Sequence, residues 1–178
     1  EAGREDPADL IRRYTGAAES AQALEAVKAF WSRFVDTETV DTPGEALNFM
    51  TNTWLKYQAI SCRLWGKSAL YQVSAGYGFR DQLQDSQIFL VSEPELTRQQ
   101  LLRHAAQQFV EGDVLHWWFS IRGGGPRTNC SDDLLWLPFI LDAYLQETDD
   151  FSIVDEMIPF LNGPAAPLYE HCKRAIER

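Results

Sequence analysis

Cysteine, long hydrophobic runs and positive charge are all scarce in this sequence, and each shortage excludes a class of protein. The three cysteines, Cys62, Cys130 and Cys172, are far apart and in no metal-ligand spacing. We therefore expect reduced thiols in a cytoplasmic setting and no metal site. No apolar run approaches the ~20 residues of a membrane helix, so we expect no membrane segment in this chain. The net charge of −10 argues against nucleic acid or an anionic membrane surface as a partner.

The sequence does contain enough apolar and aromatic residues for a buried core. Apolar residues make up 45% of the 178 residues and aromatic residues 12%, with six Trp. This composition excludes a disordered chain, and the length suits one domain or part of a larger one. The acidic balance remains compatible with a neutral ligand such as a sugar.

Helical periodicity dominates the chain and no strand pattern stands out, so we predict an all-α fold. The polar residues 1–16 are predicted to be a linker, and a capping box at Thr42-Pro43-Gly44-Glu45 to start a long helix. Thr97 with Gln100 is predicted to cap a later helix, and Pro138 to kink another. The predicted helices span residues 20–35, 43–69, 80–91, 97–112, 131–147, 151–161 and 168–178.

The connections between these helices alternate between long and short. In an up-down helical array, alternate connections lie at the same end. The two long loops, Tyr71–Asp85 and Gly112–Asp133, should therefore share one face. Functional residues concentrate on such loops over a rigid scaffold, so we expect a binding site there.

The first long loop ends in GYGFRDQLQD, which gathers side chains of the kind that bind sugars. Asp81 and Asp85 are four residues apart and share a helix face, with Arg80 and Gln82 beside them. Carboxylates and amides exchange hydrogen bonds with sugar hydroxyls. The alternative is an Arg80–Asp85 salt bridge on a solvated helix end.

The second long loop combines tryptophans with acidic residues. Trp117 and Trp118 are adjacent and cannot both face one core, so one of them can stack on a sugar ring; the alternative is that the tryptophans anchor the loop in the core. His116 is either a general acid or base or a structural donor. Asp132 and Asp133 stand where a helix N-terminus favours carboxylates, and capping alone explains one of them.

Three separated motifs, GFRDQLQDS, EGDVLHWW and GGGPRTNCSDDLLWLPF, occur in this order. From about Leu24 onward the sequence resembles glycoside hydrolase family 94, the inverting β-glycoside phosphorylases, and within it the phosphorylase-like domain of cyclic β-1,2-glucan synthase. The resemblance implies an (α/α)6 barrel. Residues 42–178 would be the first half of that barrel, and residues 1–41 a linker region with its helix at 20–35.

The resemblance also implies a reaction. Inorganic phosphate attacks the anomeric carbon of a β-glucosyl unit while one Asp protonates the leaving oxygen. Phosphate is then a co-substrate, no further cofactor is implied, and one acid suffices where ordinary glycosidases need two carboxylates. The family's general acid lies in a GDWND-like motif that does not occur here, so we expect it beyond Arg178. We therefore expect this chain to be inactive alone and to self-associate through exposed half-barrel surface.

The expected partner is a β-glucan or β-glucoside oligosaccharide, bound in the cytoplasm or by the cytoplasmic part of a membrane-anchored synthase. By the resemblance, Asp81 with Arg80 matches the motif whose Asp holds the glucosyl unit. The predicted substrate-binding residues are Arg80, Asp81, Gln82, Asp85, Trp117, Arg127, Thr128 and Asp133. The alternative hypothesis is a non-catalytic helical carbohydrate-binding or scaffolding domain, or the remnant of a degraded gene.

Overall fold

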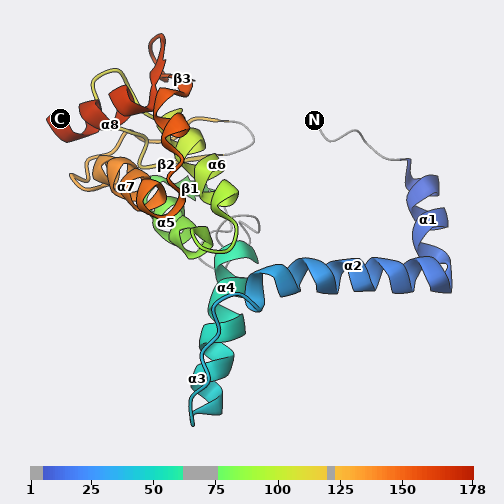
Figure 1. Ribbon diagram of the computed structural model, residues 1–178. Coiled ribbons are helices and arrows are strands. Elements are labelled where there is room, and N and C mark those ends of the chain that lie inside the picture. The colour runs from blue at the N-terminus through green and yellow to red at the C-terminus, as the bar shows by residue number, and fades with distance from the viewer. Residues whose placement is uncertain (1–5, 62–75, 120–122) are drawn as a thin grey trace. The chain divides into compact units, whose positions relative to one another are not determined.

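A computed structural model of the chain describes residues 6–61, 76–119 and 123–178. These residues are mostly helical, with two small antiparallel sheets (Figure 1), which confirms the predicted all-α fold. Contacts divide the chain into two compact units, Glu1–Thr53 and Trp54–Arg178. The described parts of both predicted loops belong to the second unit.

The first unit begins with two helices. α1 spans Pro7–Thr15 and α2 spans Ala17–Val35, three residues earlier than the predicted start. The sequence pattern does not predict α1, because few apolar positions mark it. Its start is nevertheless well specified, since the Asp6 side chain accepts a hydrogen bond from the Ala8 amide at 2.9 Å and Pro7 is the first helical residue.

The long helix predicted over 43–69 begins two residues later and contains a wider turn. Its described segments are α3 (Glu45–Phe49), the π-helical segment η1 (Met50–Trp54) and α4 (Leu55–Gln58). The predicted end of this helix, near Ala69, lies outside the described residues. The π-helical turn was not predicted, because its side-chain spacing differs little from that of an α-helix.

The predicted capping box at the start of α3 is wrong. Gly44 occupies the N-cap position, with no side-chain cap. The Thr42 hydroxyl and amide both donate to the Asn48 side-chain oxygen, at 2.7 and 3.0 Å. Asn52, one turn further along, bonds the amide and the carbonyl of Val40. These two asparagines hold the preceding loop along the helix, and this long-range role replaces the expected local cap.

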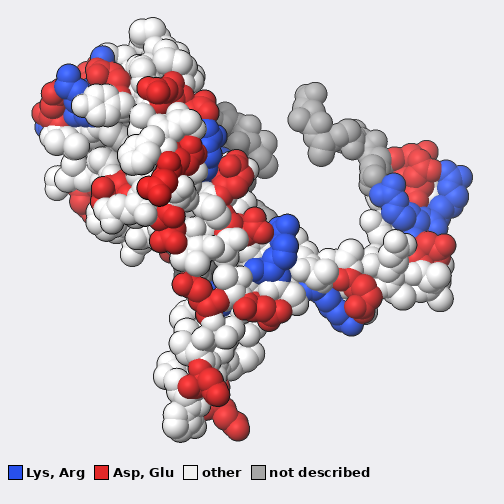
Figure 2. All heavy atoms as spheres, viewed as in Figure 1, with Lys and Arg blue, Asp and Glu red and all other residues white. Residues whose placement is uncertain are grey.

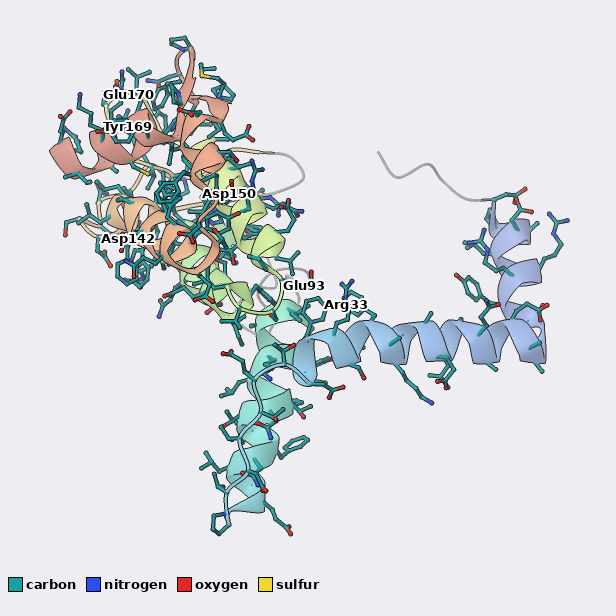
Figure 3. All side chains as sticks on the ribbon, in the orientation of Figure 1. Arg33, Glu93, Asp142, Asp150, Tyr169 and Glu170 are labelled. Carbon is teal, nitrogen blue, oxygen red and sulfur yellow. The ribbon has the colours of Figure 1, made fainter. Side chains whose placement is uncertain are left out.

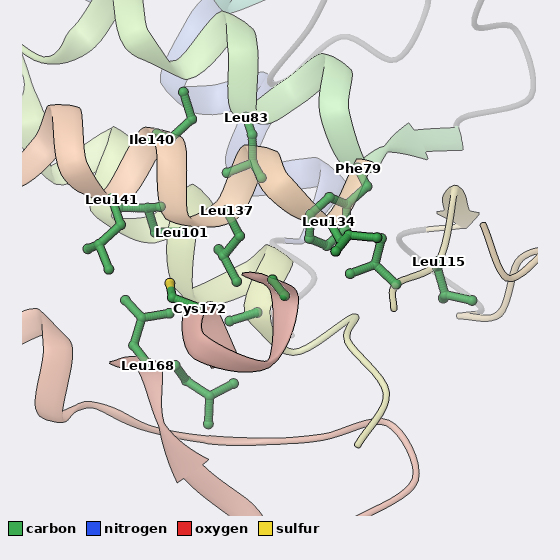
Figure 4. Close-up of a cluster of buried hydrophobic side chains, with 14 of the residues drawn as sticks. Phe79, Leu83, Leu101, Leu115, Leu134, Leu137, Ile140, Leu141, Leu168 and Cys172 are labelled. Carbon is green, nitrogen blue, oxygen red and sulfur yellow. The ribbon is translucent and has the colours of Figure 1, made fainter. Parts of the chain in front are cut away.

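The second unit is built on helices that enclose one core. Leu83, Leu101 and Leu137, from three different helices, are fully buried in the cluster that Figure 4 shows. Full burial of one such side chain stabilises the fold by about 1.5–3 kcal/mol. The elements that form the unit after α4 are α5 (Phe79–Ser86), η3 (Gln87–Phe89), α6 (Pro94–Ala105), η4 (Asp133–Leu135), α7 (Trp136–Thr148), η5 (Phe151–Asp155) and α8 (Leu168–Glu177).

Two of the predicted signals act differently in these helices. Thr97 and Gln100 do not cap α6, which starts at Pro94; both are buried, and the Thr97 hydroxyl donates to the Ser86 carbonyl at 2.7 Å. Pro138 does not interrupt α7, because the helix begins at Trp136. A proline in the first turn lies where backbone amides have no partner within the helix.

Short strands are the elements that the sequence analysis missed. β1 (Gly76–Gly78) pairs antiparallel with β2 (Trp117–Phe119), and β3 (Met157–Pro159) pairs with β4 (Ala165–Pro167). The helix predicted over 151–161 is therefore wrong beyond η5. Three-residue strands are too short to show alternation, which explains the error.

Acidic side chains dominate the surface. The chain has 26 Asp and Glu against 16 Lys and Arg, and Figure 2 shows acidic groups spread over the visible face. Tyr169 and Glu170 lie on α8 (Figure 3), and Tyr169 is exposed. In the described part of the chain, each helix is too short or too polar to cross a bilayer.

Candidate functional site

The β1–β2 pair brings the two predicted loops together. Gly78 pairs with Trp117, and the Phe79 amide donates to the His116 carbonyl at 3.0 Å. The GFRDQLQD motif and the tryptophan motif are therefore adjacent backbones. This confirms the prediction that the loops around Tyr77 and Trp117 lie on the same side.

Buried neighbours fix the backbone at each candidate position. Phe79, Leu115 and Leu134 belong to the core cluster of Figure 4. Each is adjacent in sequence to a polar residue of the site, namely Arg80, His116 and Asp133 respectively. The polar side chains therefore project from backbone that core packing holds in place, which favours a preorganised site.

The two faces of the β1–β2 pair differ sharply. Tyr77 and Trp118 are opposite each other and buried, with ring centroids 5.5 Å apart. On the other face, Gly78 is opposite Trp117, whose ring is only partly buried. The adjacent tryptophans thus point to different sides, as predicted. Trp118 anchors the loop, and Trp117 remains partly exposed, with its ring edge-on to that of Phe119 at 5.1 Å between centroids.

Asp81 shares this second face with Trp117. A methyl group added at Gly78 would collide with the Asp81 carboxylate, so the carboxylate lies directly over Gly78. Residues directly opposite in an antiparallel pair point to the same side, so the Trp117 side chain and the Asp81 carboxylate lie on the same side of the pair. A carboxylate beside a partly exposed indole ring is a combination that binds sugar hydroxyls together with the apolar face of the ring.

Arg80 forms an ion pair across the two loops. Its Nη1 lies 2.9 Å from the Asp132 Oδ2, and about half of each side chain is exposed. The hydrogen bond raises the pKa of Arg80 and lowers the pKa of Asp132. The alternative Arg80–Asp85 salt bridge is therefore wrong. The sequence pattern placed Asp132 at a helix N-terminus but did not reveal its pairing with Arg80, which is 52 positions away.

The remaining polar residues of the first motif lie elsewhere. Gln82 is fully buried, and its side-chain oxygen accepts a hydrogen bond from the Gly78 amide at 2.6 Å. It therefore holds the turn between β1 and α5. Asp85 lines a cleft of about 510 Å³ together with Leu55 and Gln58 of α4.

Asp133 is the centre of a buried hydrogen-bond network. Its side chain is 1% exposed and accepts hydrogen bonds from the His116 Nδ1, at 2.7 Å, and from the Thr128 hydroxyl. A buried carboxylate is costly unless it is hydrogen-bonded, and these donors meet that need. Asp133 therefore supports the loop from within, whereas Thr128 also lines a cavity of about 480 Å³ beside Asn129 and Cys130.

Arg127 is likewise engaged within the protein. Its guanidinium forms a two-point ion pair with Asp113, bonds Glu111 at 3.0 Å and lies 4.1 Å over the Phe109 ring. The hydrogen bonds from Arg127 lower the pKa of Asp113. Neither acidic partner was predicted, although the run EGD shows two acids close together ahead of the tryptophans. Arg127 therefore ties the later part of the second loop to the start of the same loop.

The triple glycine at 123–125 shapes the part of the second loop that runs back past Trp117. Gly123 and Gly124 have φ angles of 70° and 75°, a left-handed conformation that glycine adopts without strain. A side chain at Gly125 would collide with the Trp117 carbonyl oxygen, so only glycine allows this close approach. The triple glycine therefore serves a tight turn behind Trp117.

One group of described residues could hold a metal ion by geometry alone. Ligand atoms of His116, Cys130 and Asp133 all lie within 4.8 Å of one another. The Asp133 carboxylate already accepts two hydrogen bonds, from His116 and Thr128. In this arrangement the group is a hydrogen-bond network with a thiol at its edge.

Sequence comparisons place the chain among carbohydrate-active enzymes. Residues 30–178 match the profile of the Glycosyl hydrolase 94 superfamily, catalytic domain. The chain is 45% identical over 173 residues to the cyclic β-(1,2)-glucan synthase NdvB of Rhizobium meliloti, covering 87% of this chain and 6% of the synthase. It is 31% identical to the N,N′-diacetylchitobiose phosphorylase of Vibrio proteolyticus, covering 94% and 24%. It is 27% identical to the solabiose phosphorylase of Paenibacillus borealis, covering 98% and 21%.

The chain thus spans about a quarter or less of the length of these relatives. The matched region holds the β1–β2 pair, the Arg80–Asp132 ion pair and the Asp133 network. Catalytic domains of this family are α/α barrels, in agreement with the helical fold. The profile match covers most of the sequence, and the chain belongs to the glycosyl hydrolase 94 superfamily.

Proposed function

We propose that this chain is the part of a family 94 catalytic domain that holds the glucosyl unit during inverting phosphorolysis of a β-glucoside or β-glucan. The observation that carries the proposal is the shared face of Asp81 and Trp117, which joins two distant motifs. Relatives that match the chain are glycoside phosphorylases and a glucan synthase. A β-linked gluco-oligosaccharide is therefore the proposed partner.

The predicted residues divide into two roles under this proposal. Asp81 and Arg80 bond sugar hydroxyls, and the exposed face of Trp117 packs against the sugar ring. Asp85 borders the cleft next to α4, where a longer glucan chain would extend. Gln82, Arg127, Thr128 and Asp133 hold the loops that carry the contacts, as their internal hydrogen bonds indicate.

The proposed chemistry needs one protein acid and one phosphate. Inorganic phosphate is the co-substrate of related phosphorylases, and no further cofactor is needed. Phosphate takes the place of the second carboxylate of a glycosidase. The general acid and the phosphate pocket are assigned to a part of the domain that these residues do not include, so this chain alone is proposed to be inactive.

We also propose which part of the domain architecture these residues form. Residues 1–41 form a linker region and residues 42–178 the first half of an (α/α)6 barrel in the cytoplasm. Leu135, Phe139 and Ile176 are large apolar side chains that are 45%, 56% and 66% exposed. We propose that helices of the second half cover such surface, and that the chain self-associates without them.

Binding of a β-linked gluco-oligosaccharide to the purified chain tests the proposal. Asp81→Asn should weaken binding by about 10- to 100-fold, because a hydrogen bond to a charged group contributes about 1.5–3 kcal/mol. Asp142→Asn is the matched control, since Asp142 lies on α7 (Figure 3) and bonds only Gln146 among the hydrogen bonds of described side chains. Equal affinities of both variants, or no binding by the unmodified chain, would contradict the proposal. Equal affinities of the two variants would at the same time support a scaffolding or general carbohydrate-binding domain.

A further inference from the structure

His116 lies where the two motifs of the site meet. Its carbonyl accepts from the Phe79 amide at 3.0 Å, and its amide donates to the Pro126 carbonyl at 2.8 Å. The residue therefore joins the start of α5 to the glycine turn behind Trp117. Its backbone is held on both sides, so its ring projects from a fixed point of the second loop, one residue before Trp117.

The ring of His116 is held at one nitrogen. Nδ1 lies 2.7 Å from the Asp133 Oδ2, and the Asp133 side chain is 1% exposed whereas 47% of the His116 side chain is exposed. A carboxylate can only accept hydrogen bonds, so Nδ1 carries the proton. In the neutral ring, Nε2 then has a lone pair and acts as an acceptor. Within the described residues, the hydrogen bonds of this ring are confined to Nδ1.

Asp133 is well suited to fix this tautomer. The Thr128 hydroxyl bonds the same carboxylate oxygen, and the adjacent Leu134 is part of the core. The neighbouring Asp132 holds Arg80 in the same way. Two consecutive carboxylates at the start of η4 thus each position one polar side chain, one from each loop.

We propose that His116 contacts the substrate, with Nε2 accepting a hydrogen bond from a glucosyl hydroxyl, and that Asp133 is the positioning residue that fixes the tautomer. The inference rests on the proposed function of the site. It adds an acceptor to a site whose other proposed contacts are the Arg80 donor, the Asp81 carboxylate and the Trp117 ring. A neutral acceptor of fixed orientation discriminates between sugars by the direction of one hydroxyl, because the analogue without that hydroxyl leaves it unpaired.

Two substitutions of His116 separate the two ring nitrogens. In His116→Asn, the amide nitrogen replaces Nδ1 and can still donate to Asp133, but nothing replaces Nε2. In His116→Gln, the longer amide can reach the position of Nε2 but loses the bond to Asp133. We expect His116→Asn to weaken binding of a β-linked gluco-oligosaccharide by about 3- to 10-fold, the range of one neutral hydrogen bond, without lowering the melting temperature. His116→Gln should recover part of the affinity at a lower melting temperature.

The tautomer that Asp133 is proposed to fix can be read from the ring itself, while the affinities of the two His116 variants separate substrate contact from a structural role. Long-range ¹H–¹⁵N spectra of the imidazole at pH 8, assigned with His116→Asn, should show the proton on Nδ1. Asp133→Asn should shift it toward Nε2, because an amide can donate to Nδ1. Titrations are run with a chelator, so that a cation shared with Cys130 does not contribute to binding.

The possible results distinguish this inference from the proposed function. If the unmodified chain binds no β-glucoside, both are overturned. If it binds, and Asp81→Asn weakens binding while His116→Asn does not, the proposed function stands and the role of His116 is overturned. A proton found on Nε2 in the unmodified chain also overturns the inference, whatever the affinities.

Discussion

At the scale of single residues, the site depends on which polar groups are buried and which keep exposed surface. Gln82 and Asp133 are buried, and each is hydrogen-bonded to a neighbouring loop or turn. Arg80, His116 and Trp117 remain partly or largely exposed. Buried polar groups of the first kind stabilise the loops, and the exposed groups are available to a ligand.

A substitution at Gly125 tests whether the close approach of its backbone to Trp117 is needed for the stability of the fold. Gly125→Ala should destabilise the chain by about 1–3 kcal/mol, because the added methyl group collides with backbone atoms of Trp117 and Trp118 that cannot easily move. The free energy of unfolding in urea measures this. Gly44→Ala is the control, since its methyl group would meet atoms no closer than 3.7 Å. Equal stability of the two variants would show that the loop tolerates a side chain at Gly125.

The sequence identified the polar residues of the site but not their partners. The two tryptophans were predicted to face different sides because consecutive side chains cannot both face one core, and the extended backbone of β2 gives the physical reason. The Arg80–Asp132 pair was missed because its members are 52 residues apart and meet only through β1 and β2. Local patterns carry no information about such pairs. Burial of Asp133 was equally invisible, since a carboxylate near a helix start is usually solvated.

At the scale of elements, the sequence predicted the helices better than the strands. The start of α8 at Leu168 agrees with the prediction, since Pro167 precedes a regular apolar spacing. β1 and β2 escaped prediction because only three residues of each are paired. These two strands nevertheless decide the geometry of the site. A short sheet between helices depends on tertiary pairing, which no local pattern contains.

α6 carries a buried histidine that should make the fold sensitive to acid. Burial lowers the pKa of His104 from 6.5 to about 3, so this ring is neutral in the folded chain at neutral pH. In the unfolded chain the ring takes up a proton below about pH 6.5, and the folded ring does so only near pH 3. Stability from this residue is therefore complete above pH 6.5 and falls progressively as the pH drops toward 3. Melting temperatures between pH 7.5 and 4.5 should decrease accordingly.

One substitution isolates the contribution of His104 to the pH dependence of stability. His104→Leu removes the titrating ring and should flatten the decline of the melting temperature with falling pH. The flattening is partial, because burial also lowers the pKa of His171 on α8, which contributes with the same sign. Parallel pH profiles of the variant and the unmodified chain would show that His104 is not buried in its neutral form.

At the scale of the whole molecule, we predict that residues 1–178 alone do not catalyse phosphorolysis. General acid catalysis contributes about 100- to 10,000-fold to a rate, and positioning of the nucleophile about 7–11 kcal/mol of barrier lowering. Neither the acid nor the phosphate pocket has a proposed counterpart in these residues. The assay is release of α-glucose 1-phosphate from a β-linked glucan and phosphate. Robust release by a pure sample would mean that an acid of the second loop, such as Asp133, acts in catalysis.

The central claim is that the Trp117 face of the β1–β2 pair binds a glucosyl unit. The indole N–H resonances of the six tryptophans, assigned by single Trp→Phe variants, report directly where a sugar binds. During titration with a β-linked gluco-oligosaccharide, the Trp117 resonance should shift with saturation while that of the buried Trp118 changes little. Saturable shifts at a tryptophan outside β2, such as Trp31 or Trp54, with Trp117 unchanged, would contradict the account.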